Sequence, residues 1–192
     1  MAPLSPRPFS LGNILSLAKL RGPPLDSLAV LSHYLPMREL PHTKSCFVCG
    51  ESNAHGLHLH FETDGQVVRA RFTPRKEHVG FQGVTHGGIL ATLLDEIMVW
   101  ACAVGAKKFG FCAEMTVRFQ RPSAPGEELV ATAELVENRR GRIFEAKAEL
   151  RNPAGEIVAT STGKYMPVRD ADLHLLQRDM VGDADWVLGS RS

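Results

Sequence analysis

The sequence predicts an α+β fold in which an antiparallel sheet covers one long helix. Residues 89–104 form the one segment whose apolar side chains recur at helical spacing and extend around most of the helix circumference. Such a helix is expected to lie buried against a sheet. Two strand-like segments precede this helix and four follow it, and turn signals separate them. This order of elements indicates the α+β class.

Two strands are expected before the helix. Residues 57–63 alternate between apolar and polar side chains, which is typical of a half-buried strand. Asp64-Gly65 follows and predicts a two-residue hairpin turn, so residues 67–72 form the second strand. Residues 80–88 then contain four glycines. This density indicates that the backbone there needs unusual conformations or approaches another group closely.

Four strands are expected after the helix, joined as a meander. They cover residues 111–119, 128–137, 143–151 and 157–167, with turn residues at 122–126, 138–141 and 152–155. We therefore divide the chain into three parts: an N-terminal extension at 1–45, one folded domain at 46–167 and a polar C-terminal tail at 168–192. The extension is rich in proline and carries a predicted short helix at 25–34, and the tail has room for one helical turn.

The charge balance excludes some classes of partner. The 22 Lys and Arg residues nearly cancel the 21 Asp and Glu residues, so nothing in the bulk composition favours nucleic acid or an anionic membrane surface. We see no apolar stretch that predicts a membrane-spanning helix. Residues 1–25 contain bases and no acid, as a transit peptide would, but we favour an arm that docks on the domain. The four cysteines have no regular spacing, which fits a reducing cytoplasm.

The start of the predicted helix is suited to binding an oxyanion. His86-Gly87-Gly88 stands where the helix begins. The first turn of a helix leaves backbone N–H groups unpaired, and the helix dipole adds partial positive charge there. Glycine allows a ligand oxygen to approach these donors closely. An oxyanion that forms when a carbonyl group is attacked needs this arrangement of donors.

Asp95 is the second candidate for chemistry. It lies on the otherwise apolar helix, where a carboxylate costs free energy unless it has partners or a function. Eight residues separate it from Gly87, which is about 12 Å along a helix with a rise of about 1.5 Å per residue. The two groups can hardly serve one carbonyl within one subunit. If two subunits pack with antiparallel helices, the glycine pair of one meets Asp95 of the other, which predicts an active site in a dimer.

His86-Gly87-Gly88, six intervening residues and Asp95 resemble the signature of the PaaI-like, phenylacetate-pathway type of hotdog-fold acyl-CoA thioesterase. The resemblance extends over roughly residues 46–167, including the stretch CFVCG at 46–50 upstream and EMTVRF at 114–119, RP at 121–122 and GR at 141–142 downstream. It implies a hotdog fold, with an antiparallel sheet wrapped around one helix. It further implies hydrolysis of an acyl-CoA thioester, no cofactor, and a homodimer or homotetramer.

The resemblance also implies roles for single residues. The N–H of Gly87, with that of Gly88, would polarise the thioester carbonyl, and His86 would shape the turn. Asp95 would act either as a general base on water or as a nucleophile, and the sequence leaves both open. Some relatives have Ser or Thr where this chain has Cys112, and many have Asn where it has Gly80. Both positions are expected to contact substrate.

Several other residues have both a functional and a purely structural interpretation. Arg139, Arg140 and Arg142 form either a docking point for coenzyme A phosphates or a solvated turn. We interpret Cys46-x-x-Cys49 as two ordinary thiols and expect no metal, because no second pair of cysteines or spaced histidines accompanies it. The histidines that could complete such a site are at positions 42, 55, 58 and 60.

For three side chains we also state an expectation about burial or pairing. Glu96 should lie at the edge of the apolar stripe of the helix or pair with a base. Cys102 and Cys112 lie in apolar sequence and are expected to be buried.

Two hypotheses in which the protein is not an enzyme remain as alternatives. One is a non-catalytic domain that binds or senses acyl-CoA, since a fold does not by itself determine activity. A sensor of this kind would be expected to carry a DNA-binding segment, and residues 1–45 are too rich in proline for a helix-turn-helix. The other is a structural dimerisation domain with a vestigial pocket, which the presence of Asp95 argues against.

Overall fold

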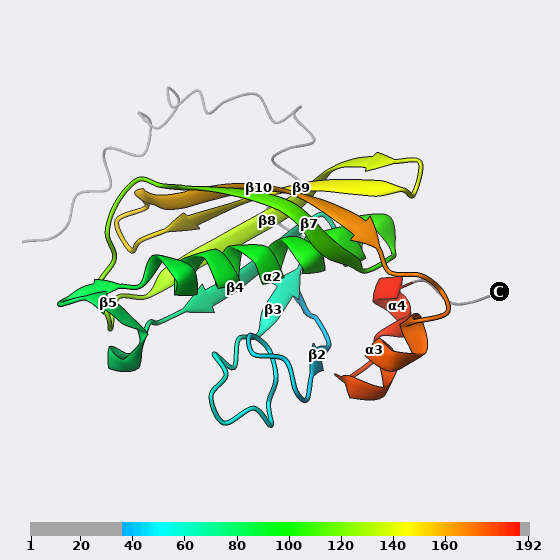
Figure 1. The fold of residues 1–192 in the computed structure, drawn as a ribbon, viewed down its shortest axis with the longest axis horizontal. Helices are drawn as coiled ribbons and strands as arrows, with labels where there is room; N and C mark the ends of the chain where they lie inside the picture. The colour runs from blue at the N-terminus through cyan, green and yellow to red at the C-terminus, as the bar shows by residue number, and fades with distance from the viewer. Residues whose placement is uncertain (1–35, 189–192) are drawn as a thin grey trace, which may run out of the picture. The chain divides into compact units, whose positions relative to one another are not determined.

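The computed structural model describes residues 36–188. The predicted helix at 25–34, and the alternatives weighed for residues 1–25, lie outside this range. Within it, one long helix, α2 (Gly87–Ala106), packs against a seven-stranded antiparallel sheet (Figure 1). The strand order is β1-β3-β4-β8-β9-β10-β7. The predicted α+β class with one central helix is confirmed.

The strands of this sheet differ greatly in length. The short ones are β1 (Arg38–Glu39) and β3 (Phe61–Thr63), at one side of the sheet. The longer ones are β4 (Val67–Phe72), β8 (Leu129–Arg139), β9 (Ile143–Arg151), β10 (Ile157–Pro167) and β7 (Gly110–Phe119). The bounds of β4 and of the four strands after α2 lie within two residues of those expected from apolar alternation.

Helix α2 forms the centre of the core. Its fully buried side chains include Leu93, Leu94, Ile97 and Met98, which lie under the sheet with strand residues such as Leu129. The helix is long and apolar enough to cross a membrane by length and composition, but more than half of its most apolar window is buried inside the protein. Its hydropathy is therefore accounted for by packing against the sheet.

The position of β7 differs from the predicted meander. Strands β8, β9 and β10 do follow one another as neighbours, but β7 pairs with β10 at the far edge of the sheet. The chain therefore crosses the sheet between β7 and β8, and β8 pairs with β4. Local alternation gives the position of each strand along the chain but not its partner, because partners are selected by packing over the helix.

The first predicted strand is shorter than expected. Only Phe61–Thr63 belongs to β3, because His58 adopts a positive φ of 53° and interrupts the extended backbone. Residues 57–60 instead line up with the preceding loop, where Leu57 N–H donates to Phe47 O and Leu59 N–H to Val48 O. The turn that follows is also longer than two residues, since Thr63 pairs with Val68.

Segments on both sides of residues 46–167 pack on the sheet and on each other. Strand β1 pairs with β3, and β2 (His42–Thr43) pairs with β11 (Met180–Val181). The C-terminal segment contains two short helices rather than one turn, α3 (Leu173–Asp179) and α4 (Asp185–Leu188). Val187 of α4 is fully buried.

A small ribbon lies beside the start of α2. It consists of β5 (Val79–Phe81) and β6 (Val84–Thr85), preceded by the 3-10 helix η2 (Lys76–His78). The sharp turn between the strands contains Gly83, whose φ of 76° favours glycine. The ribbon leads directly into the N-terminus of α2, and so it positions the glycine pair predicted to carry chemistry.

Candidate functional site

Two cavities lie along α2 and β7. The first, of about 580 Å³, lies at the N-terminus of α2 and is lined by Gly80, Phe81, residues 84–87, Leu90 and residues 119–123. The second, of about 620 Å³, includes Asp95 and Glu96 of α2, residues 110–112 of β7, Cys46, Trp100, Phe109, Leu175, Leu176 and Met180. The predicted oxyanion-binding glycine and the predicted acid therefore line different cavities of the same chain.

His86 is the N-cap of α2, and this decides which glycine N–H is available. Its Nδ1 accepts a hydrogen bond of 2.8 Å from Gly88 N–H, and its carbonyl accepts one of 3.0 Å from Ile89 N–H. Among residues 36–188, nothing accepts a hydrogen bond from Gly87 N–H. The free donor at this helix terminus is thus Gly87, and Gly88 N–H is engaged by the cap.

Close contacts explain the glycines around His86. A Cβ on Gly88 would lie 2.8 Å from His86 Nδ1, so a larger residue there would disturb the cap. A Cβ on Gly80 would lie 3.0 Å from His86 Cα. A Cβ on Gly87 would lie 3.3 Å from Cζ of Phe119, at the end of β7. Glycine at position 80 therefore allows β5 to pack directly on His86.

The Asp95 carboxylate accepts a hydrogen bond from a residue of strand β10. Tyr165 of β10 donates a hydrogen bond of 2.9 Å from its hydroxyl to Asp95 Oδ1. Burial, followed by the charge of Asp95, raises the pKa of Tyr165, so this hydroxyl stays protonated. This partner of Asp95 was not predicted from the sequence. The alternation along β10 could have indicated it, because it places Tyr165 on the buried face, where a hydroxyl needs an acceptor.

Cys112 lies next to this pair but is exposed, so the expectation that it would be buried is wrong. Its position on the edge strand β7 leaves it uncovered, whereas Cys102 on α2 is buried as expected. Cys112 is paired with Tyr165 across the two strands. Desolvation, and then the nearby Asp95 carboxylate, raise the pKa of Cys112 to about 11. The side chain is therefore predominantly a neutral thiol near neutral pH.

Comparison with known proteins identifies this part of the chain. Residues 82–159 match the family model of the thioesterase superfamily. This region is a thioesterase superfamily domain. It spans the N-terminus of α2, Asp95 and strands β7 to β9. The chain is similar to human acyl-coenzyme A thioesterase 13, with 29% identity over 97 residues, which are 50% of this chain and 68% of that protein.

Solved structures resemble the thioesterase domain in fold. A crystal structure of a thioesterase superfamily protein is 30% identical, with a TM-score of 0.59, over 64% of this chain and 63% of that one. The PaaI protein from the phenylacetic acid degradation operon of E. coli is 23% identical, with a TM-score of 0.54, over 59% and 81%. The predicted hotdog fold is confirmed. Alignments with the curated relatives span 61–68% of their own lengths.

The three arginines predicted to dock phosphates do not approach either cavity of their own chain. They lie at the turn between β8 and β9, where Arg140 and Gly141 adopt positive φ angles. Arg139 contacts two carboxylates, Glu137 at 3.2 Å and Glu145 at 2.7 Å. A contact with coenzyme A through Arg139, Arg140 or Arg142 stays a prediction, and it would require a site formed with another chain.

Glu96 does not pair with a base. Its Oε1 lies 3.3 Å from Cys49 Sγ and 3.7 Å from Cys46 Sγ. Burial raises the pKa of Glu96 to about 8. Sequence reasoning missed this cluster because Glu96 lies 47 residues from Cys49 along the chain. Only the packing of the Cys46–Cys49 loop on α2 brings the three side chains together.

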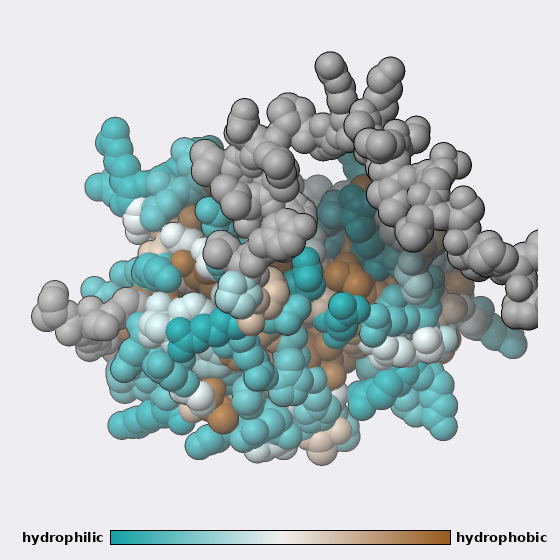
Figure 2. Space-filling view, turned by 180° about the vertical axis from the view of Figure 1, so that it is seen from behind, coloured by the Kyte–Doolittle hydropathy of each residue, from teal (hydrophilic) through white to brown (hydrophobic). Residues whose placement is uncertain are grey.

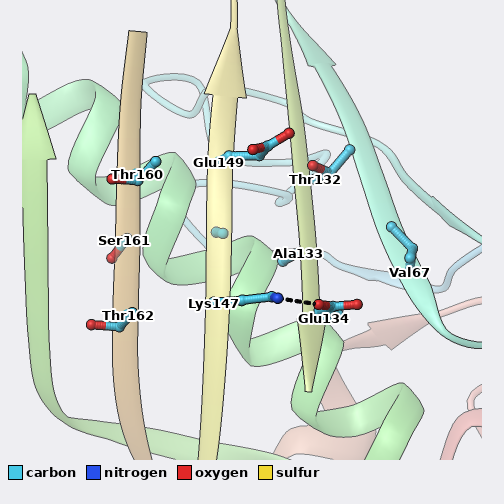
Figure 3. Close-up of a pocket in the computed structure, with 10 residues that line it drawn as sticks. Val67, Thr132, Ala133, Glu134, Lys147, Glu149, Thr160, Ser161 and Thr162 are labelled. Carbon is cyan, nitrogen blue, oxygen red and sulfur yellow. Dashed lines mark ion pairs between the residues drawn. The ribbon is translucent and has the colours of Figure 1, made fainter. Parts of the chain in front are cut away.

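A third hollow, of about 440 Å³, lies on the face of the sheet away from α2 (Figure 3). Polar residues of β8, β9 and β10 line it, and Lys147 is paired with Glu134 at 2.6 Å. None of the sequence-predicted site residues lines this hollow. We therefore place the candidate active site at the two cavities beside α2.

Proposed function

We propose that this thioesterase domain hydrolyses acyl-CoA thioesters at an active site formed by two copies of the chain. The observation that carries the proposal is the separation of two complementary half-sites. Gly87 offers a free N–H at a helix N-terminus, and Asp95 lies in another cavity, about 12 Å further along α2. Each half lacks what the other has, so two chains related by a twofold axis would complete two sites.

The edge strand β7 supports this arrangement. It forms one edge of the sheet over ten residues, most of them exposed, with Phe111 and Phe119 both more than half exposed. Much of the described surface seen in Figure 2 is hydrophilic, with separate hydrophobic patches between polar atoms. A long edge strand with exposed apolar side chains readily pairs with another strand. We infer that β7 pairs with β7 of a second copy.

The register of this pairing follows from the cavities. Cys112 lines the Asp95 cavity, and Phe119 lines the Gly87 cavity. If two β7 strands pair antiparallel about a twofold axis between their Thr116 residues, Met115 of one chain lies opposite Val117 of the other, and Phe119 lies opposite the β-bulge at residues 112–113. This register would bring Asp95 of one chain toward Gly87 of its partner, and it commits the proposal to a testable geometry.

The chemistry assigned to each group follows from its hydrogen bonds. Gly87 N–H would bind the carbonyl oxygen and the negative charge that develops on it. Because His86 Nδ1 accepts from Gly88 N–H, a neutral His86 carries its proton on Nε2 and has a donor, not a base, to offer. Asp95 retains one carboxylate oxygen beyond the one that Tyr165 engages.

Asp95 can use that oxygen in two ways. As a general base it takes a proton from water as the water oxygen attacks the carbonyl carbon. The tetrahedral intermediate then collapses to a carboxylic acid and expels the thiolate of coenzyme A, which takes up a proton. As a nucleophile it attacks the carbonyl carbon, the C–S bond breaks and the coenzyme A thiolate leaves and takes up a proton. Water then hydrolyses the resulting mixed anhydride to the free acid and regenerates the Asp95 carboxylate. Tyr165 orients the carboxylate in both cases.

The substrate class is supported by the relatives and by the shape of the second cavity. One relative is named as an acyl-coenzyme A thioesterase. Behind Asp95, the cavity wall contains Trp100, Phe109, Phe111, Leu175 and Leu176. A cavity of about 620 Å³ with such a wall can take an acyl chain or an aromatic acyl group, while the coenzyme A moiety extends to solvent.

The test is release of free coenzyme A, measured by thiol trapping. The panel comprises straight-chain acyl-CoA esters from acetyl to palmitoyl, with benzoyl-CoA and phenylacetyl-CoA, each with wild type and Asp95→Asn. We expect hydrolysis of part of the panel by wild type and a loss of at least roughly a hundredfold in kcat for the variant. Binding of acyl-CoA without hydrolysis would replace the proposal with a binding or sensing domain. Hydrolysis that is unchanged in Asp95→Asn would reject Asp95 as the acid.

A further inference from the structure

A cluster of three metal-ligating side chains lies beside the proposed active site. Cys46 and Cys49 come from the loop before β3, and Glu96 comes from α2. One ligand atom from each, two sulfurs and one carboxylate oxygen, lie within 4.8 Å of one another. No other group of three or more His, Cys, Asp or Glu side chains between residues 36 and 188 meets this condition.

The two sulfur–oxygen distances within this Cys46–Cys49–Glu96 cluster fit a tetrahedral ion. With Zn–S near 2.3 Å and Zn–O near 2.0 Å, the sulfur and oxygen ligands of one tetrahedral zinc lie about 3.5 Å apart. Glu96 Oε1 lies 3.3 Å from Cys49 Sγ and 3.7 Å from Cys46 Sγ. One ion between these atoms would need only small shifts of the side chains.

The loop that carries the two cysteines is tightly built. Val48 N–H donates to Cys46 Sγ at 3.2 Å, and Gly50 N–H donates to Cys46 O at 3.0 Å. A Cβ on Gly50 would lie 2.2 Å from Cys46 O, so the turn requires glycine. Thr43 supports both cysteines, because its Oγ1 accepts from Cys46 N–H at 3.1 Å and lies 3.5 Å from Cys49 Sγ. Such hydrogen bonds to a ligand and its neighbours are typical of metal sites.

The charges of the cluster also point to a cation. The carboxyl group of Glu96 lies against two thiols, and among residues 36–188 no Lys, Arg or His forms an ion pair with it. His42 and His60, which could have joined a metal site, pair with Glu51 and Glu39 instead. A partly buried acid without a counter-ion is costly, and a divalent ion would compensate it.

We propose that Cys46, Cys49 and Glu96 bind one Zn²⁺ ion. The three side chains supply three ligands, and Cys46 and Glu96 both line the cavity that contains Asp95, so solvent from this cavity would take the fourth position. Thiolate ligands favour Zn²⁺ over Mg²⁺ or Ca²⁺. The ion would fasten the cysteine loop to α2 one residue from Asp95, and it would thereby fix part of the cavity wall. This site is distinct from the groups assigned to hydrolysis.

Cobalt(II) is the probe that tests the ligands directly. The full-length chain is reduced, freed of metal with a chelator under anaerobic conditions and titrated with Co²⁺ while its absorption spectrum is recorded. We expect one Co²⁺ per chain, with thiolate-to-cobalt charge transfer in the near ultraviolet and the intense visible bands of tetrahedral coordination. Zn²⁺ added afterwards should displace the Co²⁺ and raise the thermal transition of the protein.

Matched variants separate this site from the other thiols. Cys49→Ser and Glu96→Gln should each weaken Co²⁺ binding at least roughly tenfold. Cys102→Ala removes a buried thiol elsewhere on α2 and should bind Co²⁺ as wild type does. Circular dichroism checks that each variant folds, and if Cys49→Ser does not fold, Glu96→Gln decides.

Two results would overturn the proposal. One is a Co²⁺ spectrum without thiolate charge transfer, or Co²⁺ binding that Cys49→Ser and Glu96→Gln leave unchanged. The other is failure of the reduced chain to take up Co²⁺ or Zn²⁺, while exposure to air makes Cys46 and Cys49 unreactive toward thiol reagents together. That second result would identify the pair as a redox-active dithiol.

Discussion

The Tyr165 hydroxyl donates a hydrogen bond of 2.9 Å to Asp95 Oδ1, which connects strand β10 to the middle of α2. Tyr165 is fully buried, and its place on the strand is fixed on both sides, by β9 and by β7. The sheet therefore sets the direction of the carboxylate that we assign to catalysis. A carboxylate held by a rigid element is oriented before substrate arrives, which lowers the entropic cost of the reaction.

Tyr165→Phe should lower kcat with little change in KM. The variant removes a hydrogen bond to a charged group, a loss of about 1.5–3 kcal/mol, or roughly 10- to 100-fold in rate if the bond matters equally in the transition state. Steady-state hydrolysis of the best acyl-CoA substrate measures both constants. A fall in thermal stability with unchanged kcat would show that the hydroxyl serves the fold and not Asp95.

Gly87→Ala should reduce kcat/KM by roughly 10- to 100-fold, as expected when a donor to an oxyanion is obstructed. The added methyl group would lie 3.3 Å from Phe119 and would reduce access to the free N–H. Alanine favours a helix more than glycine does, so urea unfolding should show no loss of stability. Thr92→Ala, on the same helix and outside both cavities, is the control and should keep its activity. Equal activity of wild type and Gly87→Ala would remove Gly87 from the mechanism.

His86→Ala should lower the free energy of unfolding by about 1 kcal/mol, the usual value of a helix N-cap. The imidazole accepts from Gly88 N–H at 2.8 Å, and alanine leaves this donor unpaired. Asn is a good N-cap, so His86→Asn should restore most of the stability. Urea denaturation compares the three proteins. Equal instability of the Asn and Ala variants would mean that the imidazole stabilises this turn by packing and not by capping.

Thr116→Lys should separate the proposed dimer. Thr116 is exposed on β7 beside the proposed twofold axis, so two lysines would meet there. Thr162→Lys is the matched control, because Thr162 is exposed and lies directly opposite Thr116 on β10, one strand in from the edge. Sedimentation velocity and thioester hydrolysis should show a monomer without activity for Thr116→Lys and an active dimer for Thr162→Lys. An active monomer would refute a site shared between chains.

Cys112 should react slowly with iodoacetamide despite its exposure. Its pKa is raised to about 11, so little thiolate is present near pH 8, and its alkylation rate should keep increasing up to about pH 11. The Asp95 carboxylate contributes to the raised pKa of Cys112. Asp95→Asn should therefore lower the pKa of Cys112 and speed its alkylation at pH 9. Mass spectrometry of peptides follows Cys112 separately from the other three thiols. Reaction at the rate of an ordinary exposed thiol would contradict the contact with Asp95.

Features that depend on neighbours in the sequence could be predicted from it. Apolar side chains at helical spacing located α2, and alternation located β4, β8, β9 and β10, because both patterns arise from one face of an element turning toward a core. The glycine pair at the start of α2 and Asp95 on the same helix also predicted the two half-sites that we propose. Their separation of eight residues led to the hypothesis of a site shared between two chains.

Features that depend on distant segments were decided by tertiary structure alone. No local pattern could place β7 beside β10, because many strands of similar alternation compete for the same edge. Contacts across 70 residues, such as Tyr165 with Asp95, and across 47, such as Cys49 with Glu96, appear only when α2 is packed. The sequence thus determined which groups can do chemistry, and the packing of the sheet around the helix determined which of them meet.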